Sequence, residues 1–162
     1  MIIVSNSSPI IFLGKVQQLK LLNILFNTPI LVAEEVVKEL HVDQRPEMAE
    51  LTNSTLISVV KTPGGLPGVE FLGEGEKKSI ILASMKKASL LLMDDKSGRA
   101  IAEALNIPVM GTAGVLLLAL KRKCITHPQW HSLLNELIHR HKYRISIEVY
   151  NKLMVEASFI QK

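Results

Sequence analysis

The stretch Leu90-Leu91-Leu92-Met93-Asp94-Asp95-Lys96-Ser97-Gly98-Arg99 decides the fold that we predict for this chain. Its first four residues are apolar, which predicts a buried strand over Leu90–Met93. The pattern that follows predicts a helix over Lys96–Leu105. Asp94 and Asp95 therefore stand where a strand gives way to a helix. Asp94 could simply cap that helix, so the pair alone does not identify a functional site.

The same alternation of strand and helix runs through the rest of the chain. Further strands are expected over Ile2–Ser5, Pro29–Val32, Leu56–Val60 and Pro108–Met110. One helix should begin at Ser8 and Pro9, and the others are expected over Gln18–Phe26, Ala33–Leu40, a turn at Glu47–Thr52, Glu74–Lys87, Thr112–Arg122, Gln129–His139 and Ile147–Ser158. Apolar strands separated by helices predict a three-layer α/β/α sandwich with a central, mostly parallel sheet.

Length and composition suggest one domain over residues 1–162. A chain of 162 residues with 48% hydrophobic residues can bury its own core and is not a disordered chain. Cys124 is the one cysteine, which excludes an internal disulfide and fits a reducing compartment. The longest apolar run, Ala113–Leu120, is far below the roughly 20 residues that span a bilayer. We therefore expect a cytoplasmic protein with no membrane segment.

Positive charge is concentrated near the C-terminus. The formal net charge is +4, and from Lys121 onward eight Lys and Arg stand against three Glu. We accordingly divide the domain into a core over 1–125 and a basic helical part over 126–162. A basic region of this kind suits a polyanionic partner such as RNA, although a solvated surface would have the same composition.

Polar residues follow the predicted strands at their carboxyl ends, and helices add further carboxylates. In parallel sheets, ligands bind outside the carboxyl ends of the strands. Clustered carboxylates repel one another, and Mg²⁺ or Mn²⁺ relieves that repulsion and can activate water for phosphodiester cleavage. Taken singly, each residue could be a helix cap, a turn residue or a surface residue. The candidates are Asn6, Glu39, Glu74, Glu76, Asp94, Asp95 and Thr112.

Five blocks of the sequence resemble those of the PIN-domain family, in the same order. They are Val4-Ser5-Asn6-Ser7-Ser8-Pro9-Ile10-Ile11, Val36-Val37-Lys38-Glu39-Leu40, Gly73-Glu74-Gly75-Glu76, Leu91-Leu92-Met93-Asp94-Asp95-Lys96-Ser97-Gly98-Arg99 and Gly111-Thr112-Ala113-Gly114-Val115-Leu116. Together they span about Ile2 to Ile125. The resemblance is nearest to small PIN-like proteins related to VapC-type toxins.

This resemblance implies an endoribonuclease of toxin type that depends on Mg²⁺ or Mn²⁺. It also implies a homodimer, sometimes paired with a small antitoxin protein. Carried over by position, the implied metal ligands are Glu39, one of Glu74 and Glu76, and one of Asp94 and Asp95, with Thr112 supporting the metal or its water. Within the two pairs, the sequence leaves both members open.

Asn6 departs from the family pattern, because an Asp usually stands at this catalytic and metal-binding position. An amide oxygen can still coordinate a hard cation, but it brings no negative charge. The alternative function is therefore a catalytically degenerate PIN-like module that binds RNA or a protein partner without cleaving. A nuclease directed at DNA is a third hypothesis, since phosphate contacts alone do not distinguish DNA from RNA.

Overall fold

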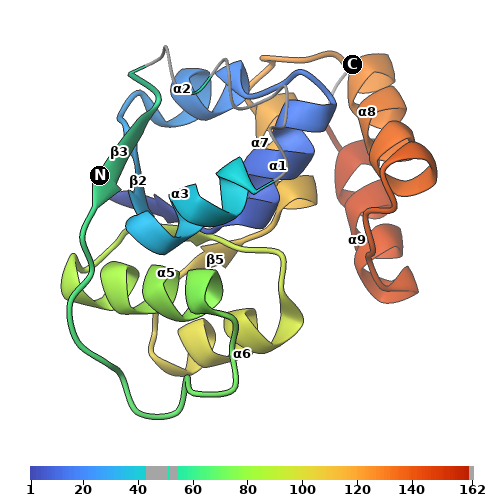
Figure 1. Ribbon diagram of the computed structural model, residues 1–162. Helices are drawn as coiled ribbons and strands as arrows, with labels where there is room; N and C mark the ends of the chain where they lie inside the picture. The colour runs from blue at the N-terminus through green and yellow to red at the C-terminus, as the bar shows by residue number, and fades with distance from the viewer. Residues whose placement is uncertain (43–50, 52–54, 161–162) are drawn as a thin grey trace.

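A computed structural model describes residues 1–42, 51 and 55–160 of the chain (Figure 1). Apart from Leu51, the helical turn that the sequence predicts at Glu47–Thr52 lies outside the described residues. The other predicted strands and helices are all present.

A five-stranded sheet forms the centre of the molecule. Its strands are β1 (Ile3–Ser5), β2 (Ile30–Ala33), β3 (Ile57–Val60), β4 (Leu90–Leu92) and β5 (Val109–Met110). Their order across the sheet is β3-β2-β1-β4-β5, and every pairing between these strands is parallel. All the carboxyl ends therefore lie at one edge of the sheet, with β1 and β4 side by side in the middle.

Helices cover both faces of the sheet. They are α1 (Ser7–Lys15), α2 (Lys20–Phe26), α3 (Glu34–His41), α5 (Glu74–Met85), α6 (Lys96–Ala104), α7 (Thr112–Lys121), α8 (His127–Arg140) and α9 (Ile147–Ser158). Figure 1 shows α1, α2 and α7 on one side of the sheet and α5 and α6 on the other, with α8 and α9 stacked outside α7. The predicted three-layer α/β/α sandwich is thus confirmed, and its sheet is parallel throughout.

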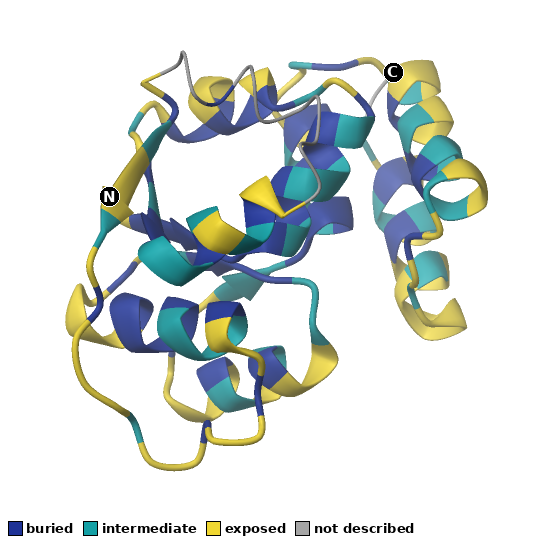
Figure 2. Cartoon of the chain, viewed as in Figure 1, coloured by how far each residue is buried: buried dark blue, intermediate teal, exposed yellow. Residues whose placement is uncertain are grey.

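The core is aliphatic, as the low aromatic content requires. Ile3, Val4, Leu91 and Leu92 are fully buried in the two central strands. Figure 2 shows the buried residues along the strands and on the helix faces that turn toward them. Trp130 is also fully buried and anchors α8 against the rest of the domain. β1, β2 and β4 are largely buried on both faces, which explains why they read as continuous apolar runs, whereas Ser58 and Val59 of the edge strand β3 are exposed.

Most element boundaries differ from the predicted ones by one or two residues, and the start of α1 matters for function. The prediction that Ser8 caps this helix is wrong. The helix begins at Ser7, and Asn6 occupies the N-cap with extended backbone. The Ser7 hydroxyl donates a hydrogen bond to Glu39, which ties the first residue of this helix to a residue 32 positions away. The turn after β1 is therefore organised by a tertiary contact.

The helices are short relative to the thickness of a membrane. Within the described residues, no single helix is long and apolar enough to cross a bilayer. The consecutive helices α1 and α2 meet the length and composition criteria only together, and they are bent by 117° relative to each other.

Candidate functional site

Asn6 lies where β1 ends, next to the end of β4. Its backbone N–H donates to the carbonyl of Leu92 over 3.1 Å, which holds the two strand ends together. The Asn6 side chain is fully buried, and neither its Oδ1 nor its Nδ2 has a hydrogen-bond partner among the residues that the structure describes. A buried amide without partners is costly, so this position suits a ligand that would satisfy it.

Glu39 joins the start of α1 to the start of α5. Its Oε2 accepts a hydrogen bond from the Ser7 hydroxyl at 2.7 Å, and its Oε1 accepts one from the Gly75 backbone N–H at 2.9 Å. A Cβ added to Gly75 would lie only 2.3 Å from Glu39 Oε1. Glycine at this position is therefore what allows the carboxylate to approach the helix so closely.

Glu74 and Glu76 occupy different environments although they are two residues apart. Glu74 is exposed and forms an ion pair with Lys77, and this hydrogen-bonded contact lowers its pKa. Glu76 is half-buried, and burial raises its pKa. The negative charges of Glu39 and Asp95 raise the pKa of Glu76 further, against a lowering by a backbone hydrogen bond. The fold thus brings Glu76 toward the other carboxylates and leaves Glu74 outside.

Asp94 is held by hydrogen bonds on both of its oxygens. Oδ1 accepts from the Thr112 backbone N–H and from the Tyr143 hydroxyl, each at 2.8 Å, while Oδ2 accepts from the Thr112 hydroxyl at 2.6 Å. Burial raises the pKa of Asp94, and these hydrogen bonds oppose that change. We call Asp94, Thr112 and Tyr143 the Asp94 clamp, because they tie the end of β4 to α7 and to the C-terminal part.

Asp95 turns to the other side of the same strand end. It is the N-cap of α6, where its Oδ1 accepts a hydrogen bond from the Gly98 backbone N–H at 2.7 Å. Only part of this carboxylate is engaged by the cap. A pocket of about 220 Å³, which we call the acidic pocket, is lined by Phe71, Leu72, Gly73, Glu76, Asp95 and Ser97. Of the two predicted pairs, the members that share a pocket are Glu76 and Asp95.

The chemistry of these donors fits Mg²⁺ or Mn²⁺. Carboxylate and amide oxygens are the hard ligands that such ions prefer, and the unpartnered amide of Asn6 would gain a partner. In the described part of the chain, no three His, Cys, Asp or Glu side chains lie close enough together to hold one ion. An ion would therefore be held by at most two of these carboxylates, unless the side chains of Glu39 and Glu76 moved closer to it. Which residues bind metal stays a prediction.

Tyr143 is a residue that the sequence analysis did not place at the site. Its ring is buried, it packs edge-on against Phe12 at 4.9 Å, and its hydroxyl also accepts from the Ala113 backbone N–H at 3.3 Å. The residues on either side, Lys142 and Arg144, are exposed. Because Tyr143 contacts Asp94 across 49 residues of sequence, no local pattern could have revealed the pairing.

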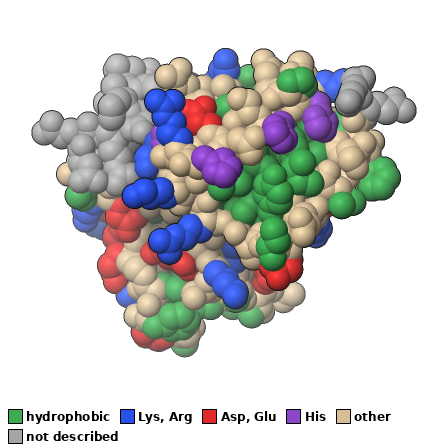
Figure 3. All heavy atoms as spheres, turned by 90° about the vertical axis from the view of Figure 1, so that its right-hand side faces the viewer, with side chains coloured by type: hydrophobic (Ala, Val, Ile, Leu, Met, Phe, Trp, Pro, Cys, Tyr) green, Lys and Arg blue, Asp and Glu red, His purple; other side chains and the backbone are tan. Residues whose placement is uncertain are grey.

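The surface over the C-terminal part is mixed in character. Figure 3 looks onto the side formed by α8 and α9, where hydrophobic side chains and several histidines gather. Lys and Arg side chains run alongside them, next to Asp and Glu. The Asp94 clamp brings the backbone on either side of Tyr143, at Lys142 and Arg144, toward the functional edge of the sheet. Hydrogen bonds at the start of α9 lower the pKa of Glu148, and the charge of Lys96 lowers it further, so the first turn of α9 lies near the start of α6.

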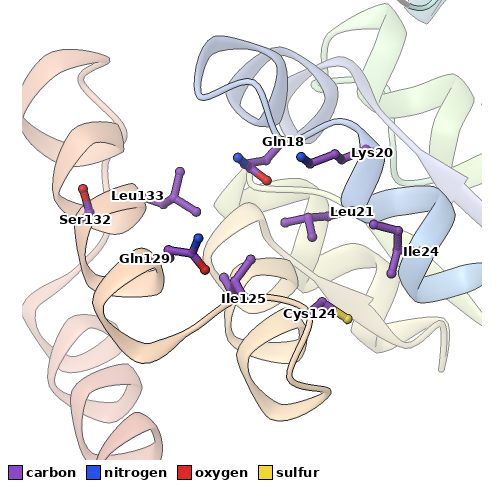
Figure 4. A pocket seen from close by; sticks show the side chains of 9 residues that line it. All are labelled: Gln18, Lys20, Leu21, Ile24, Cys124, Ile125, Gln129, Ser132 and Leu133. Atoms are coloured by element: carbon purple, nitrogen blue, oxygen red, sulfur yellow. The ribbon is translucent and has the colours of Figure 1, made fainter. Parts of the chain in front are cut away.

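A second cavity lies on another part of the surface. It has a volume of about 380 Å³ and is bounded by α2 on one side and α8 on the other (Figure 4). Its lining residues are Gln18, Lys20, Leu21, Ile24, Cys124, Ile125, Gln129, Ser132 and Leu133. None of these is a carboxylate, so this cavity offers no negatively charged oxygen ligand for Mg²⁺, and it shares no lining residue with the predicted site.

Comparisons with known proteins agree with this geometry. The family model described as DUF3368, PIN domain, matches residues 2–158, so the chain belongs to the PIN-domain family. A PilT N-terminus domain protein, SSO1118, from the hyperthermophilic archaeon Sulfolobus solfataricus P2 has a similar structure, with a TM-score of 0.58 and 19% sequence identity. The match covers 71% of this chain and 90% of that one. No curated protein matches the chain.

Membership of this family confirms the resemblance seen in the sequence and defines the class of the protein. PIN domains are generally nucleases, and generally depend on divalent metals, so the chain has a nuclease-type fold. At 19% identity, the similarity to the archaeal protein shows a shared fold and nothing finer.

Proposed function

We propose that this protein is an endoribonuclease of toxin type that depends on Mg²⁺ or Mn²⁺ and cleaves RNA phosphodiester bonds at the acidic pocket. The observation that carries the proposal is that Glu76 and Asp95 line one pocket at the functional edge of the sheet, while Glu39 is held against Gly75 at the start of the same helix as Glu76. Burial raises the pKa of Glu76, and the charges of Glu39 and Asp95 raise it further. A fold rarely accumulates repelling charges without a ligand to balance them.

Each residue has a role that its surroundings support. Glu39 and Asp95 keep fixed orientations, because the Gly75 and Gly98 backbone N–H groups hold one oxygen of each. Glu76 lines the acidic pocket and burial raises its pKa, which favours a role in accepting a proton from water. A bound Mg²⁺ or Mn²⁺ would supply activated water and charge stabilisation at the leaving oxygen.

Asn6, Thr112 and the neighbouring cations complete this proposal. The Asn6 amide oxygen would serve as a neutral ligand in place of a carboxylate. Thr112 acts through Asp94, since its hydroxyl and N–H both bind that side chain. Lys142 and Arg144 would contact RNA phosphates on the side of the Asp94 clamp.

The family resemblance extends the proposal to partners and location. A homodimer in the cytoplasm, with a small antitoxin protein as a regulator, is the arrangement that it suggests. Light scattering coupled to size-exclusion chromatography would detect a dimer, and competition between labelled RNA and DNA would identify the preferred substrate.

A degenerate module that binds RNA or a protein partner without cleavage is the second candidate, and Asn6 favours it. A neutral amide at a buried position beside the carboxylates removes one negative charge that would attract a cation. The pocket would then bind metal weakly, and the basic side chains would bind RNA without cleaving it.

Calorimetric Mn²⁺ titration of the wild type and of Asn6→Asp, with RNA cleavage assayed in parallel, separates the two candidates. Metal binding and cleavage by the wild type establish a nuclease that tolerates the amide. Binding that appears only in Asn6→Asp establishes a degenerate pocket.

The pair Glu76→Gln and Glu74→Gln tests the location of the site with a matched control. Glu76→Gln should lower the cleavage rate by at least about 100-fold, because even groups that only orient metal ligands are worth 10- to 100-fold. Glu74→Gln should leave the rate unchanged, since this side chain points to Lys77 and to solvent. Equal effects of the two substitutions would remove the acidic pocket from consideration.

A further inference from the structure

Phe71 is a large apolar side chain at the rim of the acidic pocket. Its exposed fraction is 71%, although it lines the same pocket as Glu76 and Asp95. Among the other phenylalanines, Phe26 is buried in the core and Phe12 packs against Tyr143. Exposed rings also occur elsewhere, as at Phe159, but Phe71 borders the candidate catalytic centre, where a bound ligand can cover it.

The loop that carries Phe71 holds the ring in one place. Val69 and Leu72 on either side are buried, with exposed fractions of 1% and 9%. The Leu72 backbone N–H donates to the Val69 carbonyl at 3.1 Å, which closes a tight turn with Phe71 near its tip. A ring on an anchored turn loses little conformational freedom when it binds a ligand, so its exposure is suited to recognition.

The same turn connects the ring to the carboxylates through a short stretch of backbone. Gly73 follows two residues after Phe71, and a Cβ added there would lie only 2.3 Å from Glu76 Oε2. The Glu76 carboxylate therefore rests against the backbone that leads directly from Phe71. The ring and the carboxylates of Glu76 and Asp95 thus line one pocket.

We propose that Phe71 is a nucleobase-stacking subsite for single-stranded RNA, which holds the base next to the phosphate that lies over Glu76 and Asp95. This inference rests on the proposed function and names the part of the substrate that the pocket rim recognises. Exposed aromatic rings bind bases of any identity through stacking, and such contacts operate on unpaired strands. A nucleotide combines a flat base, which can stack on Phe71, with a phosphate, which can bind a metal ion held by the carboxylates.

Binding is measured in full-length Glu76→Gln protein, with Mn²⁺ present, so that cleavage is slow and charge repulsion is reduced. Fluorescence anisotropy of a short labelled single-stranded RNA gives the affinity with and without Phe71→Ala. We expect Phe71→Ala to weaken binding roughly tenfold, the scale of one lost base stack. Phe71→Trp should retain the affinity, and its fluorescence should be quenched by the bound base, since Trp130 is fully buried and contributes a constant background.

Phe159 provides the matched control. It is 80% exposed and follows the last turn of α9, whereas the first turn of that helix lies near the functional edge. A 12-residue helix places these two ends about 18 Å apart. Phe159→Ala should therefore leave RNA affinity unchanged, and an oligonucleotide without bases should bind equally to the proteins with and without Phe71→Ala.

The outcomes separate this inference from the nuclease proposal. Loss of affinity in Phe71→Ala, in a protein whose wild type does not cleave RNA, supports the subsite and refutes the nuclease. Cleavage by the wild type with affinity unchanged in Phe71→Ala refutes the subsite and leaves the nuclease standing. Absence of RNA binding by both the wild type and Glu76→Gln, or an equal loss in Phe159→Ala, overturns the subsite; a protein partner at this rim would give the first of these results.

Discussion

Asp94 and Asp95 are neighbours in sequence, but they serve two regions that are organised in opposite ways. In the Asp94 clamp, the carboxylate receives three hydrogen bonds from Thr112 and Tyr143. In the acidic pocket, Asp95 has one backbone hydrogen bond and faces Glu76, whose pKa its charge helps to raise. A satisfied carboxylate stabilises the fold, whereas crowded and partly satisfied carboxylates leave binding capacity for a ligand.

The largest effect should come from removing the satisfied carboxylate. Asp94→Ala leaves the Thr112 hydroxyl, the Thr112 N–H and the Tyr143 hydroxyl without their acceptor, which should cost about 3 kcal/mol of unfolding free energy. Asp95→Ala removes only a helix cap and should cost about 1 kcal/mol. Urea denaturation followed by circular dichroism measures both. A loss in Asp95→Ala as large as that in Asp94→Ala would erase the distinction between the two regions.

Substitutions around the acidic pocket should instead change the cleavage rate more than the stability. Gly75→Ala places a methyl group against Glu39 and must displace its carboxylate, so cleavage should fall about tenfold, as for a lost orienting contact. The unfolding free energy of Gly75→Ala should be unchanged, because alanine is the better helix former within α5 and the Glu39 side chain can move aside. Cleavage kinetics and thermal unfolding report the two quantities.

Gly65→Ala is the control for this substitution. Nothing in the described part of the chain lies within 4 Å of a Cβ added to Gly65, which is on the loop before α5. Both activity and stability should be unchanged there, and a similar decline in both glycine variants would argue against a positional effect of Glu39.

Tyr143→Phe tests how much one member of the Asp94 clamp contributes to stability. It removes one hydrogen bond to Asp94 and one from the Ala113 N–H, while the buried ring and its contact with Phe12 are retained. Unfolding free energy should fall by about 1 kcal/mol. Asp94 keeps both bonds from Thr112, so the loss should be smaller than in Asp94→Ala. A loss equal to that of Asp94→Ala would make Tyr143 the dominant member of the clamp.

The smallest effect has the opposite sign. The raised pKa of Glu76 means that the folded protein holds this proton more tightly than the unfolded chain, so stability falls as pH rises above the ordinary value of 4.5. Glu76→Gln removes that penalty, so its unfolding free energy at pH 7 in EDTA should be higher by about 0.5 kcal/mol, the scale for a partly exposed group. The variant should accordingly unfold at a higher temperature. The difference should disappear at acidic pH, where the carboxyl is protonated in both states.

Mn²⁺ should reverse the order of the two proteins in the same melting experiment. A cation that binds the folded wild type raises its melting temperature, and Glu76→Gln should respond less because a ligand is missing. A wild type that is indifferent to Mn²⁺, together with a stabilised Glu76→Gln, would favour the degenerate module.

Local patterns were enough to predict most of the secondary structure. Strands such as Leu90–Met93 read as apolar runs, and the helix over Lys96–Leu105 follows a turn that begins with a capping residue, so their existence needs no information from distant residues. The N-cap of α1 was predicted at Ser8, two residues later than the Asn6 that the structure shows, and the contact between Ser7 and Glu39, 32 residues away, is one that no local rule includes.

The candidate site shows the same division between local and distant information. The sequence by itself determined that polar residues follow β1, β4 and β5 and that the family is PIN, because these depend on residue order. Only the tertiary structure decided the surroundings of each member of the two pairs: Glu76 and Asp95 line the acidic pocket, while Glu74 pairs with Lys77 and Asp94 is held by Tyr143. The physical reason is that successive side chains at a strand end or helix start point in different directions, and what each one meets there is supplied by segments distant in sequence.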